Sequence, residues 1–165
     1  MILNESAQSV ITRAYEAADL RALYAIEEVC FEPEVRFSRS LMRSLAVDPK
    51  CRIWIGTVDD VRVGFAIVGL HGPREYRGLV DEAAAYVWTI EVLPGYRRMG
   101  VARELLGRLE ESALEAGCAT MELHVAAENG NAQALYAAAG FALESVEAGF
   151  YGPGQDGLRY RKQLR

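Results

Sequence analysis

The feature that most constrains the fold is an extended apolar run that leads, through a short turn, into a helix. Residues 84–92, AAYVWTIEV, are rich in β-branched and aromatic residues, as buried strands are. Pro94 and Gly95 end this run, and a helical spacing of apolar residues begins at Val101. The chain is therefore expected to place a helix N-terminus beside the end of a strand.

Changes in apolar periodicity predict the other elements. Strands are expected at 10–15, 51–58, 61–70, 120–125, 141–148 and 158–164, and helices at 20–31, 39–46, 101–116 and 129–139. The order is β-α-α-β-β-β-α-β-α-β-β, which indicates an α/β protein (α+β, mixed sheet) with helices inserted between strands. Residues 1–165 form one predicted domain, since no repeat or linker interrupts them.

Turn residues predict the connections between these elements. Asp59 and Asp60 join two strand runs as a hairpin turn. Residues 71–82, HGPREYRGLVDE, are polar and contain Gly and Pro, so a loop is expected there. Residues 149–157, GFYGPGQDG, are expected to form the turn between the last two strands.

Composition excludes several classes of function. Of 165 residues, 18 are basic and 23 acidic, and a net charge of -5 argues against a nucleic-acid partner. Three widely spaced cysteines and two histidines favour neither a disulfide framework nor a metal site. With no apolar run of membrane-spanning length and no leader-like pattern at 1–10, we expect no membrane partner and a cytoplasmic location.

The turn YRRMGVAR, residues 96–103, has the properties of an anion site. Gly100 and Ala102 allow a ligand to approach the backbone closely, and the first amides of the following helix lack intrahelical partners. Such helix ends bind phosphate groups, and the arginines of the turn add positive charge. The spacing fits neither the Walker loop nor the dinucleotide fingerprint. An ordinary strand-to-helix turn remains the alternative.

A second stretch adds weight to this interpretation. Residues 128–141, ENGNAQALYAAAGF, contain the pattern N-x-x-A-x-x-L-Y-x-x-x-G-F, which begins at Asn129 and includes Tyr136 and Phe141. Together with R-x-x-G-x-A at 97–102, it resembles the GNAT superfamily of N-acetyltransferases, and most closely its RimI group, which acetylates protein N-termini. The likeness covers nearly the whole chain and is strongest from Trp88 to Phe141.

The resemblance implies acetyl-CoA as co-substrate, without a metal. Backbone groups of Ile90, Glu91 and Val92 would run along the pantetheine arm and the acetyl group, with the amide of Val92 polarising the thioester carbonyl. The turn would bind the pyrophosphate, through Arg97, Arg98, Met99, Gly100, Val101, Ala102 and Arg103. Asn129 would contact the cofactor arm, although asparagine is also a favoured helix N-cap.

The resemblance also implies that Tyr136 contacts the cofactor and is the general acid. With a pKa of about 10, a phenol is protonated at neutral pH and ready to donate to the coenzyme A thiolate. A packing aromatic is the alternative interpretation of Tyr136.

The general base is where the chain departs from the RimI pattern. His124 stands where that group has a glutamate, with Glu122 two residues earlier on the same face of a regular strand. His124 and Glu91 are the candidate bases, and a water relay is a further option. A histidine can deprotonate an α-amine of pKa about 7.7–8.0. The alternatives are a hydrogen-bonded sheet histidine and a carboxylate that only shapes the acceptor pocket.

The expected reaction is direct attack of a primary amine on acetyl-CoA. At pH 7 roughly a tenth of an α-amine is neutral, against about 0.04% of a lysine, so a protein or peptide N-terminus is the favoured acceptor. A small-molecule amine and a non-catalytic acyl-CoA-binding module are the alternatives.

Residues 31–40 and 147–157 are expected to form the acceptor pocket. Gly157 and Leu158 depart from the usual RimI ending. The chain is expected to be a monomer or a homodimer.

Overall fold

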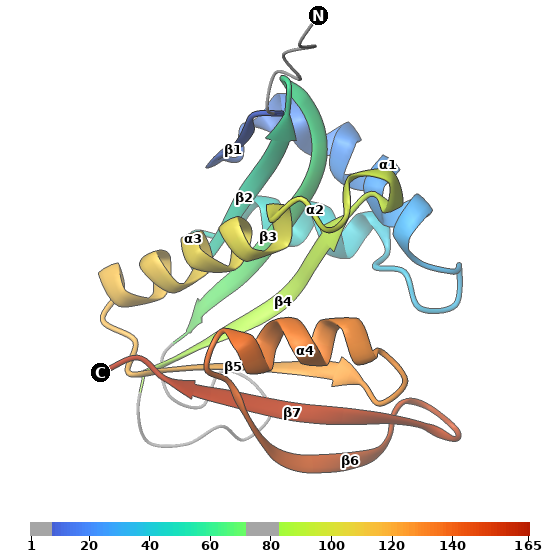
Figure 1. The fold of residues 1–165 in the computed structure, drawn as a ribbon, viewed down its shortest axis with the longest axis vertical. Coiled ribbons are helices and arrows are strands. Elements are labelled where there is room, and N and C mark those ends of the chain that lie inside the picture. Colours follow the sequence, from blue (N-terminus) through green and yellow to red (C-terminus); the bar gives the residue numbers. More distant parts are fainter. Residues whose placement is uncertain (1–7, 72–82) are drawn as a thin grey trace, which may run out of the picture.

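The fold is a seven-stranded mixed sheet with helices on both faces (Figure 1). The structure is a computed structural model, and it describes residues 8–71 and 83–165. The strands are β1 (Val10–Ala14), β2 (Cys51–Val58), β3 (Val61–His71), β4 (Ala84–Val92), β5 (Thr120–Ala126), β6 (Ala142–Gly152) and β7 (Gln155–Gln163). The α-helices are α1 (Leu20–Cys30), α2 (Arg39–Val47), α3 (Val101–Glu115) and α4 (Gly130–Ala138), with 3₁₀ turns η1 (Ala17–Asp19) and η2 (Pro94–Tyr96).

This element order confirms the order predicted from the sequence. The strands lie in the order β1-β2-β3-β4-β5-β7-β6, and each pair is antiparallel except β4 and β5. A parallel pair needs a crossover, which the strand–turn–helix unit supplies through α3. The predicted loop at 71–82 falls, after His71, outside the described residues.

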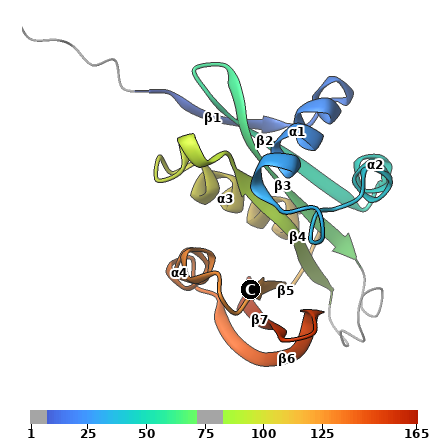
Figure 2. The same ribbon diagram turned by 90° about the vertical axis from the view of Figure 1, so that its right-hand side faces the viewer.

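Two apolar cores bury the faces of the sheet, because central strands carry apolar residues on both sides. On one face α1 and α2 bury residues such as Leu23 and Met42 against Phe65 and Ile67. On the other face the core includes Leu105 of α3. Figure 2 shows α1 and α2 on one side of the sheet and α3 and α4 on the other.

The parallel pair β4–β5 opens towards its C-terminal ends. Pairing joins Ala84–Val87 to Thr120–Leu123, and both strands continue beyond it, β4 to Val92 and β5 to Ala126. On the β3 side the register shifts between Val87 and Thr89, so Trp88 is the extra residue of a β-bulge. A bulge bends its strand and increases its twist, which accounts for the divergence of β4 from β5.

The turn of the last hairpin is shorter than the turn expected at 149–157. Strand β6 runs to Gly152 and β7 begins at Gln155, so only Pro153 and Gly154 connect them. Between Glu147 and Gly152 the register shifts, and Gly149, Gly152 and Gly154 have φ values of 66°, 133° and 72°. Glycine adopts these conformations without strain, so most of the expected turn is instead part of an irregular, bulged hairpin.

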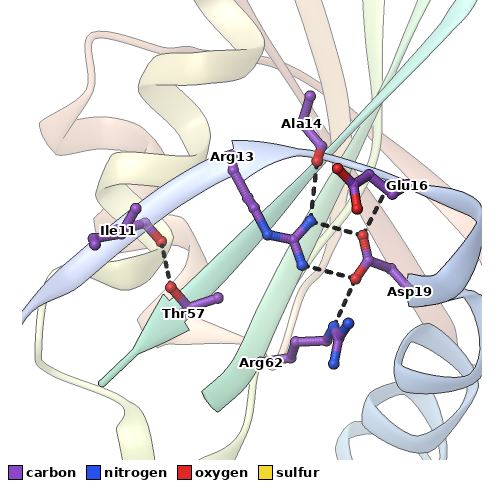
Figure 3. Close-up of polar contacts among 7 residues, drawn as sticks. All are labelled: Ile11, Arg13, Ala14, Glu16, Asp19, Thr57 and Arg62. Carbon is purple, nitrogen blue, oxygen red and sulfur yellow. Dashed lines mark hydrogen bonds and ion pairs between the residues drawn. The ribbon is translucent and has the colours of Figure 1, made fainter. Parts of the chain in front are cut away.

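A buried aspartate joins β1, η1 and β3 near the N-terminal end of the described chain (Figure 3). Both oxygens of Asp19, whose side chain is fully buried, accept bonds of 2.8 Å from the Arg13 guanidinium, and Arg62 Nε donates at 2.6 Å. The amide of Glu16 also donates to Asp19. The hydrogen bonds from Arg13 hold the pKa of Asp19 well below its usual range, and those from Glu16 and Arg62 add to the effect.

Asp19→Asn is expected to lower the free energy of unfolding by about 2 kcal/mol at pH 7, because it removes the charge that Arg13 and Arg62 bind. Since the folded-state pKa is depressed, this stabilisation is present above the unfolded pKa and is lost as pH falls towards the folded value. Urea unfolding at pH 7 and pH 3 should show the gap between the two proteins shrinking. Asp60→Asn, in the exposed β2–β3 turn, is the control, and an equal loss in both variants would contradict a special role for Asp19.

Candidate functional site

The turn before α3 presents free backbone at the start of a four-turn helix. Gly100 is the N-cap residue, with φ of 86° and no side chain to bond the first helical amides. A Cβ built on Gly100 would meet nothing within 4 Å, so the backbone is open to approach. Amides at such a terminus attract anions, and this geometry fits the predicted pyrophosphate site.

The arginines of the turn lie in two different environments. Arg98 and Arg103 are exposed beside the N-terminus of α3, where each can add positive charge. Arg97 instead donates from Nε to the carbonyl oxygen of Val92 at 3.0 Å. Arg97 thus links the turn to the end of β4, and its role as a pyrophosphate ligand stays a prediction.

The backbone N–H groups of Ile90 and Val92 face the opening between β4 and β5. The amide of Leu93 donates to Val63 on β3, at 2.8 Å. Because the N–H groups of successive residues point to opposite sides of a strand, those of Val92 and Ile90 point away from β3, towards β5. Pairing with β5 has ended at Val87, so an elongated ligand can pair with this part of β4.

Asn129 caps α4, which was one of its two predicted roles. Its side-chain oxygen accepts a hydrogen bond of 3.1 Å from the amide of Ala132. The contact predicted between Asn129 and the cofactor arm stays a prediction.

Tyr136 lies in α4 with its ring in the core beside β7. The ring packs edge-on against Phe141, at 5.8 Å between centroids, and tilted against Tyr160 at 6.5 Å. Burial raises the pKa of Tyr136, with a smaller contribution from Tyr151. The phenol is therefore protonated at neutral pH, as a general acid must be before it donates.

His124 of β5 is held at both ring nitrogens. Its Nδ1 lies 2.8 Å from the hydroxyl of Tyr86 on β4, and its Nε2 lies 3.1 Å from Glu147 Oε1 of β6. Phe150 stacks on the imidazole ring, with centroids 4.1 Å apart and planes at 10°. A carboxylate beside one nitrogen and a hydroxyl beside the other suit a group that takes up and passes on a proton.

Glu91, the other candidate base, lies in a buried site. Its side chain is 3% exposed, and Thr89 Oγ1 donates to its carboxyl group at 3.0 Å. Burial and then Glu27 raise the pKa of Glu91 well above its usual range. Glu91 is therefore protonated at neutral pH and is not poised to accept a proton.

Glu122 shares a strand with His124 but already has cationic partners. Arg159 of β7 donates to Glu122 Oε1 at 2.9 Å, and Arg161 Nε lies 3.8 Å from the same oxygen. Glu122 is therefore already engaged by arginines of β7 rather than facing His124.

Two residues of the site, Glu27 and Tyr86, were not predicted from the sequence. The contact of Glu147 with His124 was not predicted either. Glu27 follows Leu23 by one helical turn and therefore lies on the apolar face of α1, and a charged residue at such a position indicates a buried charge. Tyr86 gives no such signal, because only the register of β4 against β5 brings it to His124.

The part of the chain that the structure describes has neither a group of metal ligands nor a membrane-spanning helix. In residues 8–71 and 83–165, no three His, Cys, Asp or Glu side chains are grouped as metal ligands would be. Within the same ranges, no helix has the length and apolar character needed to cross a membrane.

Comparison with known proteins places the chain among acetyltransferases. The profile of the acetyltransferase (GNAT) family matches residues 19–141. The [ribosomal protein bS18]-alanine N-acetyltransferase of Escherichia coli K12 is 38% identical over 79 residues, which are 48% of this chain and 51% of that protein. The chain thus spans about half the length of the curated relatives it matches.

Solved structures match over nearly the whole chain. The ribosomal-protein-S18-alanine N-acetyltransferase from Escherichia coli has a TM-score of 0.79 and 25% identity, with 94% of each chain covered. Arabidopsis thaliana NAA60, solved with acetyl-CoA, has a TM-score of 0.82 and 20% identity over 94% of this chain and 98% of that one. These likenesses confirm the predicted fold.

Proposed function

Because the chain belongs to the acetyltransferase (GNAT) family, we propose that it is an enzyme that transfers the acetyl group of acetyl-CoA to the amino terminus of a protein or peptide. One observation carries the proposal: β4 parts from β5 after Val87, and its N–H groups at Ile90 and Val92 point into the opening. The N-terminus of α3, which suits an anion, lies beyond the end of β4, and His124 lies on the opposite strand.

The residues present fit acetyl-CoA. The opening suits an extended arm that pairs with a strand, and the turn at Gly100 suits a pyrophosphate, because its amides have no side-chain cap and its surface is unobstructed. Arg98 and Arg103 would add charge-assisted hydrogen bonds to the same group.

Acetyl-CoA supplies an activated acetyl thioester, and each residue of the site has a part in its transfer. The amide of Val92 donates a hydrogen bond to the carbonyl oxygen that gains negative charge. The hydroxyl of Tyr86 accepts the proton of the attacking amine and passes its own proton to Nδ1 of His124, with Glu147 beside Nε2 stabilising the imidazolium. The protonated phenol of Tyr136 donates to the departing sulfur.

Two lines of support favour an N-terminal acceptor. The curated relatives are named for the alanine N-terminus of a ribosomal protein. An α-amine also loses its proton more readily than a lysine does, because its pKa is lower by about 2.5 units. A base built on one histidine therefore suits an α-amine.

The proposal is tested by incubating the protein and acetyl-CoA with a library of synthetic peptides, polyamines and amino acids, and identifying products by mass spectrometry. We expect acetylation on peptide α-amines, with at least about tenfold lower kcat/KM for lysine side chains. Products confined to polyamines would replace the peptide acceptor with a small molecule. Acetyl-CoA binding without any product would indicate a non-catalytic binding module.

His124→Gln tests whether His124 serves as the general base. Glutamine preserves a polar side chain at the site of the imidazole but cannot take up a proton at neutral pH. We expect kcat to fall by roughly tenfold or more, with acetyl-CoA affinity kept within about twofold, since the base contributes to chemistry rather than to cofactor binding. An unchanged kcat would assign proton removal to water.

A further inference from the structure

The imidazole of His124 has to reach two partners at once. Its Nδ1 lies 2.8 Å from the hydroxyl of Tyr86, and its Nε2 lies 3.1 Å from Glu147 Oε1. These partners come from β4 and β6, which lie on opposite sides of β5 in the sheet. Proton transfer needs both distances near hydrogen-bond length, and rotation of the ring about its Cβ–Cγ bond would lengthen both. The orientation of the ring is therefore a condition for the proposed reaction.

Phe150 covers one face of this imidazole. The two ring centroids are 4.1 Å apart and the planes differ by 10°. The torsion about the Cβ–Cγ bond of a histidine has no sharp preference of its own, so packing has to set it. Rings stacked at this separation are already in contact, and a turn of the imidazole would drive its edge into the phenyl ring. The stack thus holds His124 in the plane that reaches both partners.

The bulge in β6 brings Phe150 and Glu147 to the same histidine. On a regular strand, side chains three residues apart point to opposite faces of the sheet. Beyond Glu147 the register of β6 against β7 shifts, and Gly149 has a φ of 66°. The amide of Gly149 donates to Asp156 Oδ1 of β7 at 3.0 Å, which fixes this irregular stretch. The bulge reverses the alternation, so both side chains contact His124.

Gly157 of β7 leaves the space that the Phe150 side chain occupies. A Cβ built on this buried glycine would lie 2.7 Å from Phe150 Cβ and 2.8 Å from its Cγ. These atoms form the base of the side chain, so rotation of the phenyl ring cannot relieve the collision. Unlike Gly149, Gly157 does not have a positive φ. The requirement for glycine at position 157 is therefore steric rather than conformational.

We propose that Phe150 is a positioning residue for the His124 imidazole, and that Gly157 is required to keep Phe150 in the stack. The inference rests on the proposed function, because it assigns what orients the histidine of that site. A phenyl ring has no group that takes up a proton at neutral pH, so Phe150 acts only through His124. Two departures from the RimI pattern, the histidine at position 124 and Gly157, thus belong to one packed unit.

The test compares Phe150→Ala, Gly157→Ala and Phe150→Tyr, with tetra-alanine amide as acceptor. The first variant removes the stacked ring, the second displaces it without removing an atom, and the third keeps a planar ring. We expect kcat to fall by at least about fivefold in the first two, and by less than about twofold in the third. The peptide KM and the acetyl-CoA affinity should stay within about threefold in all three variants. A raised peptide KM with unchanged kcat would overturn the proposal and make Phe150 a contact of the acceptor.

Combined variants test whether the effect passes through His124. Adding Phe150→Ala to His124→Gln should lower kcat by less than about twofold further, because no imidazole remains to be oriented. Adding Gly157→Ala to Phe150→Ala should likewise change kcat by less than about twofold, because the new methyl group meets no ring. Losses that multiply in either pair would overturn the proposal, since they would show that the residues act independently.

Nuclear magnetic resonance tests the stack without depending on activity. The chain has two histidines, His71 and His124, so comparison with His124→Gln assigns the imidazole protons. The ring current of a stacked phenyl group shifts these resonances upfield. We expect the upfield shift to be lost in Phe150→Ala and Gly157→Ala and kept in Phe150→Tyr.

An unchanged His124 resonance in Phe150→Ala would overturn the proposal. A wild-type protein that acetylates no amine would refute the proposed function instead, and the resonance would then decide by itself whether Phe150 orients His124.

Discussion

Replacing Tyr136 with phenylalanine is expected to lower kcat by about a thousandfold and to leave acetyl-CoA affinity within about threefold. The substitution keeps the ring that packs against Phe141 and Tyr160 and removes only the hydroxyl. General acid catalysis contributes about 10²–10⁴-fold in rate, and coenzyme A thiolate would otherwise leave without a proton donor. Steady-state kinetics at saturating acetyl-CoA, with calorimetry for affinity, measures both quantities.

Tyr160→Phe is the matched control, because Tyr160 is similarly buried and packs on Tyr136 from β7. We expect it to change kcat by less than about threefold, since it makes the same chemical change in the same core. An equal loss of turnover in both variants would mean that the hydroxyls matter for packing. Full activity of Tyr136→Phe would remove Tyr136 from the acid role.

Gly100→Glu is expected to weaken acetyl-CoA binding by at least about a hundredfold. The residue caps α3, and a carboxylate there would occupy the space before the helical amides and repel the pyrophosphate. A hundredfold loss corresponds to about 2.8 kcal/mol, a reasonable value for a bound anion replaced by a like charge. Calorimetric titration with acetyl-CoA and with free coenzyme A provides the measurement.

Gly117→Glu separates this effect from backbone strain. Gly117 follows the opposite end of α3, with φ of 81°, and a Cβ added to it would meet nothing within 4 Å, so its substitution brings the same strain and the same charge change. We expect both variants to lose a similar amount of stability and only Gly100→Glu to lose affinity. If Gly117→Glu binds acetyl-CoA as weakly as Gly100→Glu, the turn at 96–103 is not the pyrophosphate site.

Local patterns were sufficient to predict the elements of this fold. The apolar run at 84–92, the helical spacing after Val101 and the cap at Asn129 act over a few residues, and this cap forms the expected hydrogen bond. The hairpin at 149–157 is the exception. Its glycines permit both a long turn and a bulged strand, and pairing of β6 with β7 decides between the two.

The candidate site was only partly predictable from the sequence. The turn at Gly100 and the pattern containing Tyr136 are continuous in the chain, so local motifs indicate them. The environment of His124 depends on Tyr86, Glu147 and Phe150, which come from two other strands. Sequence spacing cannot show such partners, because strand register is set by the whole sheet.

Patterns within short stretches of the chain thus predict the order of the strands and helices. They also predict the helix N-terminus suited to an anion and the position of the Tyr136 phenol in its motif. The protonation of Glu91 is not predicted in this way, because it depends on burial and on Glu27, 64 residues away in the chain. The point at which β4 parts from β5 is likewise a property of the folded sheet. The physical reason is the same in both cases: local propensity acts between neighbours in sequence, whereas desolvation, charge and strand pairing act between neighbours in space.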